Sequence, residues 1–511
     1  MPKYNYERLS AQDASFLFAE RPFNHMHVAA TSIFRTGPMR GADGGIDFER
    51  FKRATEAALH LVPRYRQRLK WIPFENHPVW VDDRQFNLDY HIRHTALPRP
   101  GRLEQLKHLS ARIMSQPLDR SRPLWEIWVV EGLEGARFAT ISKTHHCMID
   151  GMAGADLAQI LLSTTPEQEL PDIAPYIPRP APSSGELFLD SWRQRIGMPG
   201  RIVRELLDTS WQSGSEIWSR VQAVSELLGW AVRRSSETPM NGRLGPHRRF
   251  DWLELELADV KAVRKALSCT VNDVVLASVT GAVRDFLVRR RVRPEAIEFR
   301  VAAPVSVRRE EERGQMGNRV SSWIVRLPLD ESDPRQQLER IREATQELKD
   351  SNQALGVDTM MKMAEYTPSV LMSLGVRAAS GPINMIVTNI PGPQFPLYML
   401  GAELESLFPM VPLLDGTGVG VALFSYNGKL CWGFNGDYEL VPDLRLFAKA
   451  VAASFRELAR AGGVTLDHAH LPGVAPVVDL RIVGAVEAST GTILQTPTAA
   501  RIAAAANRGE T

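Results

Sequence analysis

The sequence predicts an α/β protein that folds as more than one domain. A chain of 511 residues is longer than a single compact core usually reaches, which indicates two or three domains. Short segments rich in β-branched residues alternate with segments whose apolar residues recur at helical spacing. Six prolines between Pro166 and Pro182 interrupt this alternation, because proline removes a backbone donor and disfavours a continued helix or ladder. We therefore expect two α/β domains joined by an extended crossing segment.

The domain boundaries follow from these changes in pattern. We expect an N-terminal domain at 1–182, a helical linker or crossover at 183–247, a C-terminal domain at 248–474 and an Ala-rich tail at 475–511. The tail has no aromatic residue and no clear apolar face, so we interpret it as a loosely docked appendage.

The C-terminal half carries a regular series of expected elements. Thr270 to Asp273 has the composition of a helix N-cap before the apolar helix 274–288. The expected strands are 250–257, 299–305, 322–328, 385–388, 418–426 and 429–436, and the other expected helices are 258–267, 334–355 and a Met-rich one at 359–379.

Composition excludes several classes of protein. The net charge is +2, from 61 basic and 59 acidic residues, so no global field recruits nucleic acid. Three cysteines are too few for a disulfide framework, which favours a reducing cytoplasm. The first residues lack the apolar stretch of a signal peptide, and no run of eighteen apolar residues predicts a membrane span.

Residues 145–151, His-His-Cys-Met-Ile-Asp-Gly, are the most informative stretch for chemistry. They follow a β-branched strand at 138–144 and precede an apolar helix at 152–162. Neighbouring side chains of a strand point to opposite faces, so only one of the two histidines can face a given cleft. A histidine at a strand end beside a turn suits a general base.

Other readings of this stretch are weaker. A single His-x-x-x-Asp arises often by chance. A metal site needs a third or fourth ligand, and the sequence has no Cys-x-x-Cys or His-x-x-x-His, so we predict no metal. Cys147 beside His146 could be a nucleophile, but adjacency on a strand end does not bring two side chains together. A small buried thiol is the better interpretation of Cys147.

Further motifs make a family resemblance specific. Pro123-Leu124-Trp125-Glu126 lies about twenty residues before the histidines, and Asn272-Asp273 follows in the second half. With these, the His-His-x-x-x-Asp-Gly stretch resembles the bacterial wax ester synthase/diacylglycerol acyltransferase family. Matches continue in order over roughly residues 5–470: 9–10, 13–17, 26–28, 78–81, 88–91, 245–250, 304–308, 317–318 and 388–393.

The resemblance implies a fold and an activity. The fold would be two chloramphenicol-acetyltransferase-like domains with the active site in a channel between them. The activity would be transfer of a long-chain acyl group from acyl-CoA to a long-chain alcohol, giving a wax ester, or to diacylglycerol, giving triacylglycerol. Such a reaction needs a base for the hydroxyl proton and a donor for the tetrahedral oxyanion. It needs no covalent enzyme intermediate, no metal and no organic cofactor.

By analogy with the family, His146 is the general base and His145, on the opposite strand face, is structural. Asp150 could orient the histidine, as in a triad, or organise the turn and the helix start. The related fold implies the second role, with an arginine partner that the sequence does not reveal. Gly151 allows backbone geometry that other residues cannot adopt.

The remaining candidate residues belong to the two other motifs. Asn272 is either a donor near the reacting carbonyl or a helix cap and nothing more. Asp273 is assigned to the substrate channel, as a cap or buried polar link. Pro123, Leu124 and Trp125 are assigned to the strand edge that lines the acyl channel.

Two alternatives to the acyl-CoA enzyme stay open. One is a peptide-forming condensation enzyme fed by carrier-bound acyl groups, although no carrier-type Gly-x-Asp-Ser is present. The other is a non-catalytic protein of lipid surfaces.

We expect a cytoplasmic protein in peripheral contact with the inner membrane or lipid inclusions, because its substrates dissolve poorly in water. The segment 186–234, with tryptophans, arginines and an apolar stripe, is either that contact surface or a helical pair packed across the domains. A homodimer is left open.

Overall fold

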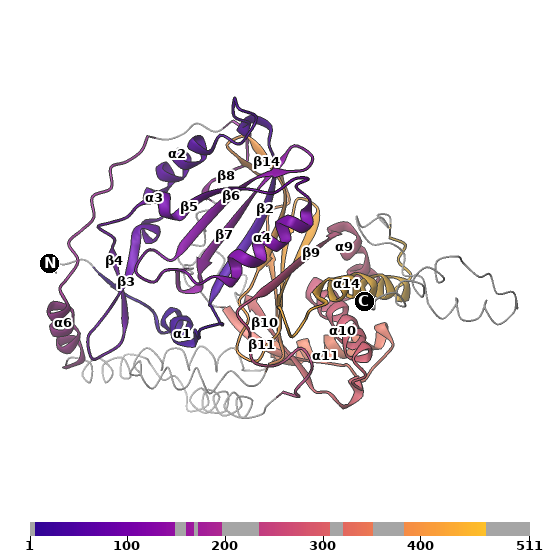
Figure 1. Cartoon of the computed structure of the whole chain (residues 1–511). Helices are drawn as coiled ribbons and strands as arrows, with labels where there is room; N and C mark the ends of the chain where they lie inside the picture. The colour runs from indigo at the N-terminus through magenta and orange to yellow at the C-terminus, as the bar shows by residue number, and fades with distance from the viewer. Residues whose placement is uncertain are drawn as a thin grey trace, which may run out of the picture. The chain divides into compact units, whose positions relative to one another are not determined.

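The computed structural model describes residues 6–148, 160–167, 172–196, 235–306, 320–350 and 383–466 (Figure 1). All of them belong to one compact unit, residues 1–468. Several expectations lie outside the described residues: Asp150 and Gly151, nearly all of the helix expected to follow them, most of the 186–234 segment, the Met-rich helix at 359–379 and the tail.

Within the described residues, one sheet has seven strands in the order β5-β6-β7-β2-β14-β13-β8. The pairs are antiparallel except β5 with β6, which is parallel. The strands are β2 (His27–Arg35), β5 (Ile92–Ala96), β6 (Trp125–Leu133), β7 (Arg137–His145), β8 (Leu162–Ser163), β13 (Tyr398–Met399) and β14 (Ala402–Met410).

Two strands of this sheet come from the other half of the sequence. β14 pairs with β2 along most of its length, so that Phe408 lies opposite Thr31. β13 connects β14 to β8. The sequence pattern predicts neither β13 nor β14. The N-terminal sheet is therefore completed by residues that the expected boundaries assign to the C-terminal domain.

A second sheet, six-stranded within the described ranges, has the order β11-β10-β12-β15-β16-β9. Its centre, β10-β12-β15, is parallel, and the outer pairs are antiparallel. All six of its strands match the strands predicted for the C-terminal half. They are β9 (Arg248–Glu256), β10 (Phe299–Ser306), β11 (Val320–Leu327), β12 (Met385–Pro391), β15 (Val419–Tyr426) and β16 (Lys429–Asp437).

A small third sheet lies at the N-terminal side of the chain. Its order is β1-β4-β3, and its buried residues pack with Leu187 of α6 (Ser184–Ile196). The strands are β1 (Glu7–Arg8), β3 (Gln67–Trp71) and β4 (Pro78–Asp82).

The remaining helices cover the sheets. α10 contacts both α11 and α14, and Figure 1 shows these three grouped beside the second sheet. The other helices are α1 (Ala11–Ala19), α2 (Phe48–Ala58), α3 (Leu88–His91), α4 (Leu103–Ser115), α9 (Leu257–Ala266), α10 (Val271–Arg289), α11 (Pro334–Asp350) and α14 (Leu444–Ala461). Short 3₁₀ turns are η1 (Gly37–Met39), η2 (Leu59–Leu61), η3 (Pro63–Arg66), η4 (His146–Met148) and η5 (Pro294–Ala296).

Helix α10 begins where the capping pattern predicts. The Thr270 side chain accepts a hydrogen bond from the backbone N–H of Asp273, and the Asp273 side chain accepts one from the backbone N–H of Thr270. This reciprocal arrangement satisfies two backbone donors that the first helical turn leaves unpaired. The N-cap prediction is confirmed, with the helix starting at Val271 rather than Val274.

The two halves share a hydrophobic core. Trp252 of β9 stacks on Phe408 of β14, with ring centroids 4.5 Å apart and planes at 9°. Met114 of α4 belongs to the same buried cluster. Because α4 packs against β9, this cluster joins the first sheet to the second.

No single helix among the described residues has the length and hydropathy to cross a bilayer; α9 and α10 reach them only as a pair bent by 96°.

Candidate active site

The two histidines sit where β7 ends. His145 is its last residue and His146 begins η4. The backbone N–H of His145 donates to the Leu124 carbonyl at 2.9 Å, and that of His146 donates to the Met26 carbonyl at 2.8 Å. The pair is therefore held between the start of β6 on one side and the start of β2 on the other. This fixes which way each side chain leaves the backbone.

The imidazole of His146 has an aromatic neighbour. It stacks on Phe16 of α1, with ring centroids 3.9 Å apart and planes at 22°. Its Nδ1 is buried and has no hydrogen-bond partner, while the residue as a whole is half-buried. Burial lowers the pKa of His146 to about 4, because the charged form loses hydration. The ring is therefore neutral near pH 7, the state in which it can accept a proton.

The ring of His145 has one hydrogen-bonded nitrogen, Nδ1, and one nitrogen, Nε2, that lies near a carboxylate without a hydrogen bond. Its Nδ1 accepts a hydrogen bond from the backbone N–H of Cys147 at 3.1 Å, so the proton of the neutral ring resides on Nε2. Nε2 lies 3.2 Å from Oε1 of Glu20. The His145 side chain is 1% exposed. The structural role expected for His145 stays a prediction.

Glu20 is the anionic centre beneath the histidines. Burial by itself would raise the pKa of this carboxyl, but His145, His27 and Arg120 outweigh burial and hold it well below its usual range. Arg120 pairs with Oε2, and the Met26 N–H donates to Oε1 at 2.8 Å. Glu20 is therefore ionised at neutral pH.

A cavity of about 330 Å³ opens beside this group. It is lined by Glu20, Arg21, Pro22, His25, His27, Pro117, Leu118, Arg120, Leu124 and His145. His145 thus faces this cavity, while His146 points to the Phe16 side. Residues 149–159, which continue the chain past His146, lie outside the described part, and Asp150 and Gly151 lie there with them.

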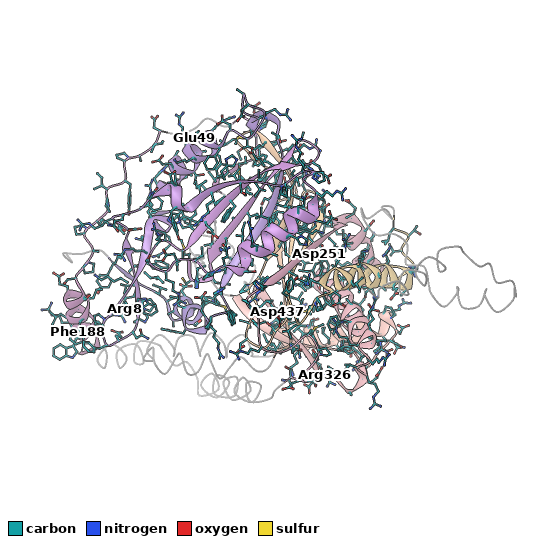
Figure 2. The ribbon with its side chains drawn as sticks, in the orientation of Figure 1. Arg8, Glu49, Phe188, Asp251, Arg326 and Asp437 are labelled. Atoms are coloured by element: carbon teal, nitrogen blue, oxygen red, sulfur yellow. The ribbon has the colours of Figure 1, made fainter. Side chains whose placement is uncertain are left out.

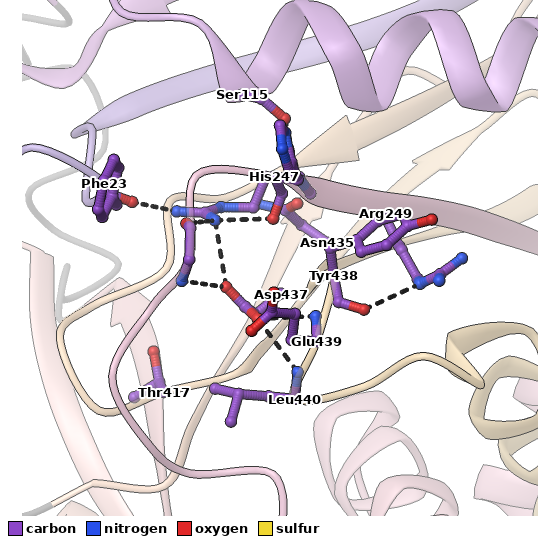
Figure 3. A network of polar contacts seen from close by, with 12 residues as sticks. Phe23, Ser115, His247, Arg249, Thr417, Asn435, Asp437, Tyr438, Glu439 and Leu440 are labelled. Carbon is purple, nitrogen blue, oxygen red and sulfur yellow. Dashed lines mark hydrogen bonds and ion pairs between the residues drawn. The ribbon is translucent and has the colours of Figure 1, made fainter.

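Residues of the C-terminal half hold the loop that contains Arg21 and Phe23, which borders the cavity. Arg21 pairs with Asp415 at 2.7 Å. The Arg248 guanidinium donates to the carbonyl of Phe23 and lies 3.4 Å from the Asp437 carboxylate, while its backbone N–H donates to Ser115 of α4 at 2.9 Å (Figure 3). The cavity therefore lies where the two halves of the chain meet.

The Pro-Leu-Trp motif supports the site from the first sheet. Leu124 lines the cavity, and its carbonyl holds the backbone of His145. Trp125 turns into the core, where its ring stacks on His91 at 4.5 Å and its Nε1 donates to the Tyr65 carbonyl at 2.8 Å. The motif thus forms the strand edge next to the histidines, and Leu124 is the motif residue that lines the cavity.

The Asn-Asp motif lies in the first turn of α10. The expected place of Asp273 is the substrate channel, but its buried carboxylate caps α10 and accepts a hydrogen bond from Thr345 at 3.0 Å. Both carboxylate oxygens are engaged inside the second half, so Asp273 is the cap and buried polar link expected from the sequence, and its assignment to the channel stays a prediction. Its carboxylate is needed where the helix leaves backbone donors unpaired.

Asn272 is exposed and is not the capping residue, since Thr270 fills that position. Its Oδ1 accepts a hydrogen bond from Nδ2 of Asn389 at 2.8 Å. Asn389 belongs to β12, within the Thr-Asn-Ile-Pro-Gly-Pro stretch. The role of Asn272 as a donor to the reacting carbonyl stays a prediction.

Three residues beside the histidines escape the sequence analysis: Phe16, Glu20 and Arg120. Phe16 lies in a recognised stretch, 13–17, but nothing in that pattern says which ring meets His146. Glu20 follows Phe16 by four residues, one helical turn, which is the only local signal that both face the same way. Among the described residues, no group of three or more His, Cys, Asp or Glu side chains is arranged to hold a metal ion.

Comparison with known proteins gives the family. Residues 9–275 match the wax ester synthase/diacylglycerol acyltransferase catalytic domain, and residues 316–459 match the C-terminal domain of the same family. The chain belongs to this family. A Mycobacterium tuberculosis protein named as a diacylglycerol O-acyltransferase is 33% identical over 464 residues, which cover 88% of this chain and 90% of that protein. The chain is therefore an acyltransferase of the wax ester synthase/diacylglycerol acyltransferase type.

Solved structures show the fold. A wax ester synthase/diacylglycerol acyltransferase from Marinobacter aquaeolei VT8 is 24% identical, with a TM-score of 0.63 over 89% of this chain and 100% of that one. The first condensation domain of the calcium-dependent antibiotic synthetase is 15% identical, with a TM-score of 0.57 over 92% of this chain and 100% of that one. The predicted chloramphenicol-acetyltransferase-like fold is confirmed.

Proposed function

We propose that this acyltransferase moves a long-chain acyl group from acyl-CoA to the hydroxyl of a long-chain alcohol or of diacylglycerol, with His146 as general base. The observation that carries the proposal is the state of His146: a neutral imidazole at a strand end, stacked on Phe16. The names of its relatives, which include diacylglycerol O-acyltransferases, support the class of acceptor.

The proposed reaction has two steps. The acceptor hydroxyl loses its proton to Nε2 of His146, because Nδ1 is buried, while the oxygen attacks the thioester carbonyl carbon. The tetrahedral intermediate then collapses, the C–S bond breaks, and the proton passes from the imidazole to the sulfur, giving the ester and free CoA. The leaving thiolate, whose thiol has a pKa of about 8.5, accepts this proton readily. No covalent enzyme intermediate, metal or organic cofactor takes part in the proposed route.

The surroundings of Cys147 support a route without a thiol nucleophile. Burial raises the pKa of the Cys147 thiol well above its ordinary value, with Asp13 and Glu20 adding to the effect. A nucleophilic cysteine needs the opposite, a thiolate stabilised in an accessible, electropositive place. The side chain of Cys147 is also buried.

The test is turnover of palmitoyl-CoA with hexadecanol and, separately, with diacylglycerol, followed by release of free thiol. His146→Ala should lower turnover by about 10²–10⁴, the contribution typical of a general base, while the melting temperature stays near that of the wild type. His108→Ala is the matched control, because His108 is an exposed histidine of α4. Near wild-type turnover by His146→Ala would overturn the mechanism.

Two outcomes with the wild-type protein address the alternatives. Faster transfer from a carrier-bound thioester than from acyl-CoA would favour a condensation enzyme, whose fold the chain shares. No turnover of palmitoyl-CoA with either acceptor would contradict the proposed substrates.

We also propose peripheral contact with membrane or lipid inclusions from the cytoplasmic side. An apolar surface supports this. Phe74, at the turn between β3 and β4, is 93% exposed and meets Phe188 of α6, with ring centroids 5.5 Å apart. Trp192, 56% exposed, follows Phe188 by one helical turn. Figure 2 shows Phe188 at the outer side of α6. Exposed aromatic side chains of this kind suit the boundary between headgroups and acyl chains.

Liposome flotation with anionic and neutral vesicles tests this surface. Phe74→Ser/Trp192→Ala should float less than the wild type, and Leu61→Ala, an exposed leucine of η2, should float equally well. Because the chain is nearly neutral, salt should weaken binding only modestly. If the double variant floats as well as the wild type, this surface does not contact the membrane. If the wild type does not float, the membrane proposal is wrong.

A further inference from the structure

Helix α1 presents two residues to the histidine pair. Phe16 stacks on His146, and Glu20, four residues later at the C-cap of α1, faces His145. Glu20 directly follows Ala19, the last residue of α1, and has an extended backbone. The helix thus contacts both histidines at once, one through an aromatic face and the other through a carboxylate.

The Glu20 carboxylate is itself held by groups from three elements. Oε1 accepts a hydrogen bond from the Met26 N–H at 2.8 Å, lies 3.2 Å from Nε2 of His145 and lies 3.7 Å from Nε2 of His27. Oε2 pairs with Arg120, whose guanidinium also donates to the carbonyl of Leu17 in α1. The side chain is 10% exposed, so these partners replace nearly all of its water.

Two of these partners lead directly to His146. Met26 donates its backbone N–H to Glu20, and its carbonyl accepts a hydrogen bond from the backbone N–H of His146. His145, held through Nε2, accepts the backbone N–H of Cys147 through Nδ1. The peptide groups on both sides of His146 are therefore tied, each through one intervening residue, to a single carboxylate.

The ring of His146 has no comparable support of its own. Within the described residues its contact is the stack on Phe16, which fixes the plane of the ring but leaves its backbone to be set elsewhere. A displacement of about 1 Å in a reacting group costs about a hundredfold in rate. The position of Nε2 of His146 therefore depends on the backbone turn that carries the ring.

We propose that Glu20 is a positioning residue for the acyl transfer, which fixes the turn bearing His146 through Met26 and His145. The inference rests on the proposed role of His146 as the base. Arg120 completes the arrangement by holding the far oxygen of the carboxylate, so the positioning unit consists of α1, the start of β2 and residue 120.

Glu20→Gln tests the unit with the least change in shape. The amide oxygen can still accept the Met26 N–H, but the amide nitrogen faces the Arg120 guanidinium as a second donor, and the neutral oxygen holds His145 less strongly. We expect kcat to fall about ten- to a hundredfold while KM for palmitoyl-CoA changes less than about twofold, because alignment and not binding is lost.

A matched control separates positioning from stability. Asp82 of β4 is also a buried carboxylate, held by two arms of Arg179 and by Gln67, and it lies in the small third sheet. Asp82→Asn should lower the melting temperature as Glu20→Gln does, but its kcat per folded molecule should equal that of the wild type. A purely structural role for Glu20 predicts the same behaviour for both variants.

A spectroscopic readout addresses the position of the ring itself. The stack on Phe16 shifts the carbon-bound ring protons of His146 upfield, and the signal is assigned by its loss in His146→Gln. In Glu20→Gln this shift should move towards the ordinary position, whereas Asp82→Asn should leave it unchanged. A wild-type shift together with wild-type kcat in Glu20→Gln would overturn the inference.

The outcomes also separate this inference from the proposed function. If His146→Ala keeps its activity, the base assignment fails, whatever Glu20 does. If His146→Ala is inactive and Glu20→Gln has wild-type kcat, only the positioning role fails. Should Glu20→Gln not fold, Arg120→Gln removes one partner of the same carboxylate. The Arg120 side chain is 42% exposed. That variant should show a smaller loss of kcat with unchanged KM, and wild-type kcat with an unmoved ring signal would again overturn the inference.

Discussion

The imidazole of His146 lies face to face with the phenyl ring of Phe16, their centroids 3.9 Å apart. This contact places an aromatic face against the ring that, in the proposed mechanism, becomes an imidazolium during transfer. The negative face of an aromatic ring stabilises a nearby cation. The stack therefore both orients the base and favours its protonated form in the transition state.

Phe16→Leu should lower kcat about two- to tenfold, because an aromatic pair contributes about 0.5–1.5 kcal/mol beyond the area it buries. Steady-state kinetics with palmitoyl-CoA measures this. Phe18→Leu is the control, since Phe18 lies on the same helix but meets Trp71 instead, with centroids 6.2 Å apart. Equal losses in the two variants would show that the stack on His146 has no special role.

The pH profile should report the lowered pKa of His146. Its ordinary value of 6.5 falls to about 4 through burial, so the free enzyme keeps a neutral base well below pH 6. We expect kcat/KM to stay level from about pH 8 down to about pH 6 and to decline only nearer pH 4. An inflection near pH 6.5 that is lost in His146→Gln, and is kept in the other variants, would contradict the burial of the ring.

The same shift predicts how stability depends on pH. The unfolded chain takes up a proton on His146 near pH 6.5, whereas the folded protein does so only near pH 4, so stability falls as the pH drops through this window. His91, whose pKa burial also lowers to about 4, acts in the same direction. Thermal denaturation of His91→Gln and His146→Gln between pH 7 and about 4.5 should show a shallower decline than in the wild type.

Arg248 and Asp437 should be energetically coupled. Their side chains are 7% and 1% exposed, and the arginine also holds the carbonyl of Phe23 beside the cavity. Removing one partner of a buried pair costs about 3–5 kcal/mol, because the other charge is left without compensation. We expect Arg248→Met to lower the denaturation midpoint strongly, and the double variant with Asp437→Asn to lose less than the sum of the single losses. Additive losses would show that the two residues act independently.

Asp150 lies outside the described residues, and its role stays a prediction from the sequence. If it organises the turn after His146, Asp150→Asn should lower the melting temperature and the activity together. If it orients the imidazole, activity should collapse while the melting temperature stays unchanged. We expect the first outcome, and a fully stable but inactive variant would contradict it.

Local signals in the sequence were sufficient for much of the fold. Strand β7 before the histidines, the six strands of the second sheet and the cap of α10 at Thr270 all depend on side-chain periodicity and on capping chemistry, which operate within a few residues. The ordered motifs around His145 and His146 were sufficient for the family. Each of these signals can be read without knowing what the segment packs against.

Tertiary structure alone decided the features that depend on distant partners. β14 completes the first sheet although its residues follow β2 by several hundred positions, because strand pairing is set by the hydrophobic faces available in the folded chain. Asp273 gained Thr345 as a buried partner, and Glu20 became the anion that holds both His145 and Met26, whose carbonyl accepts the His146 N–H. A carboxylate has the same local pattern whether it caps a helix, faces solvent or supports a histidine. Only the charges and donors that folding brings within about 3 Å of it decide between these roles.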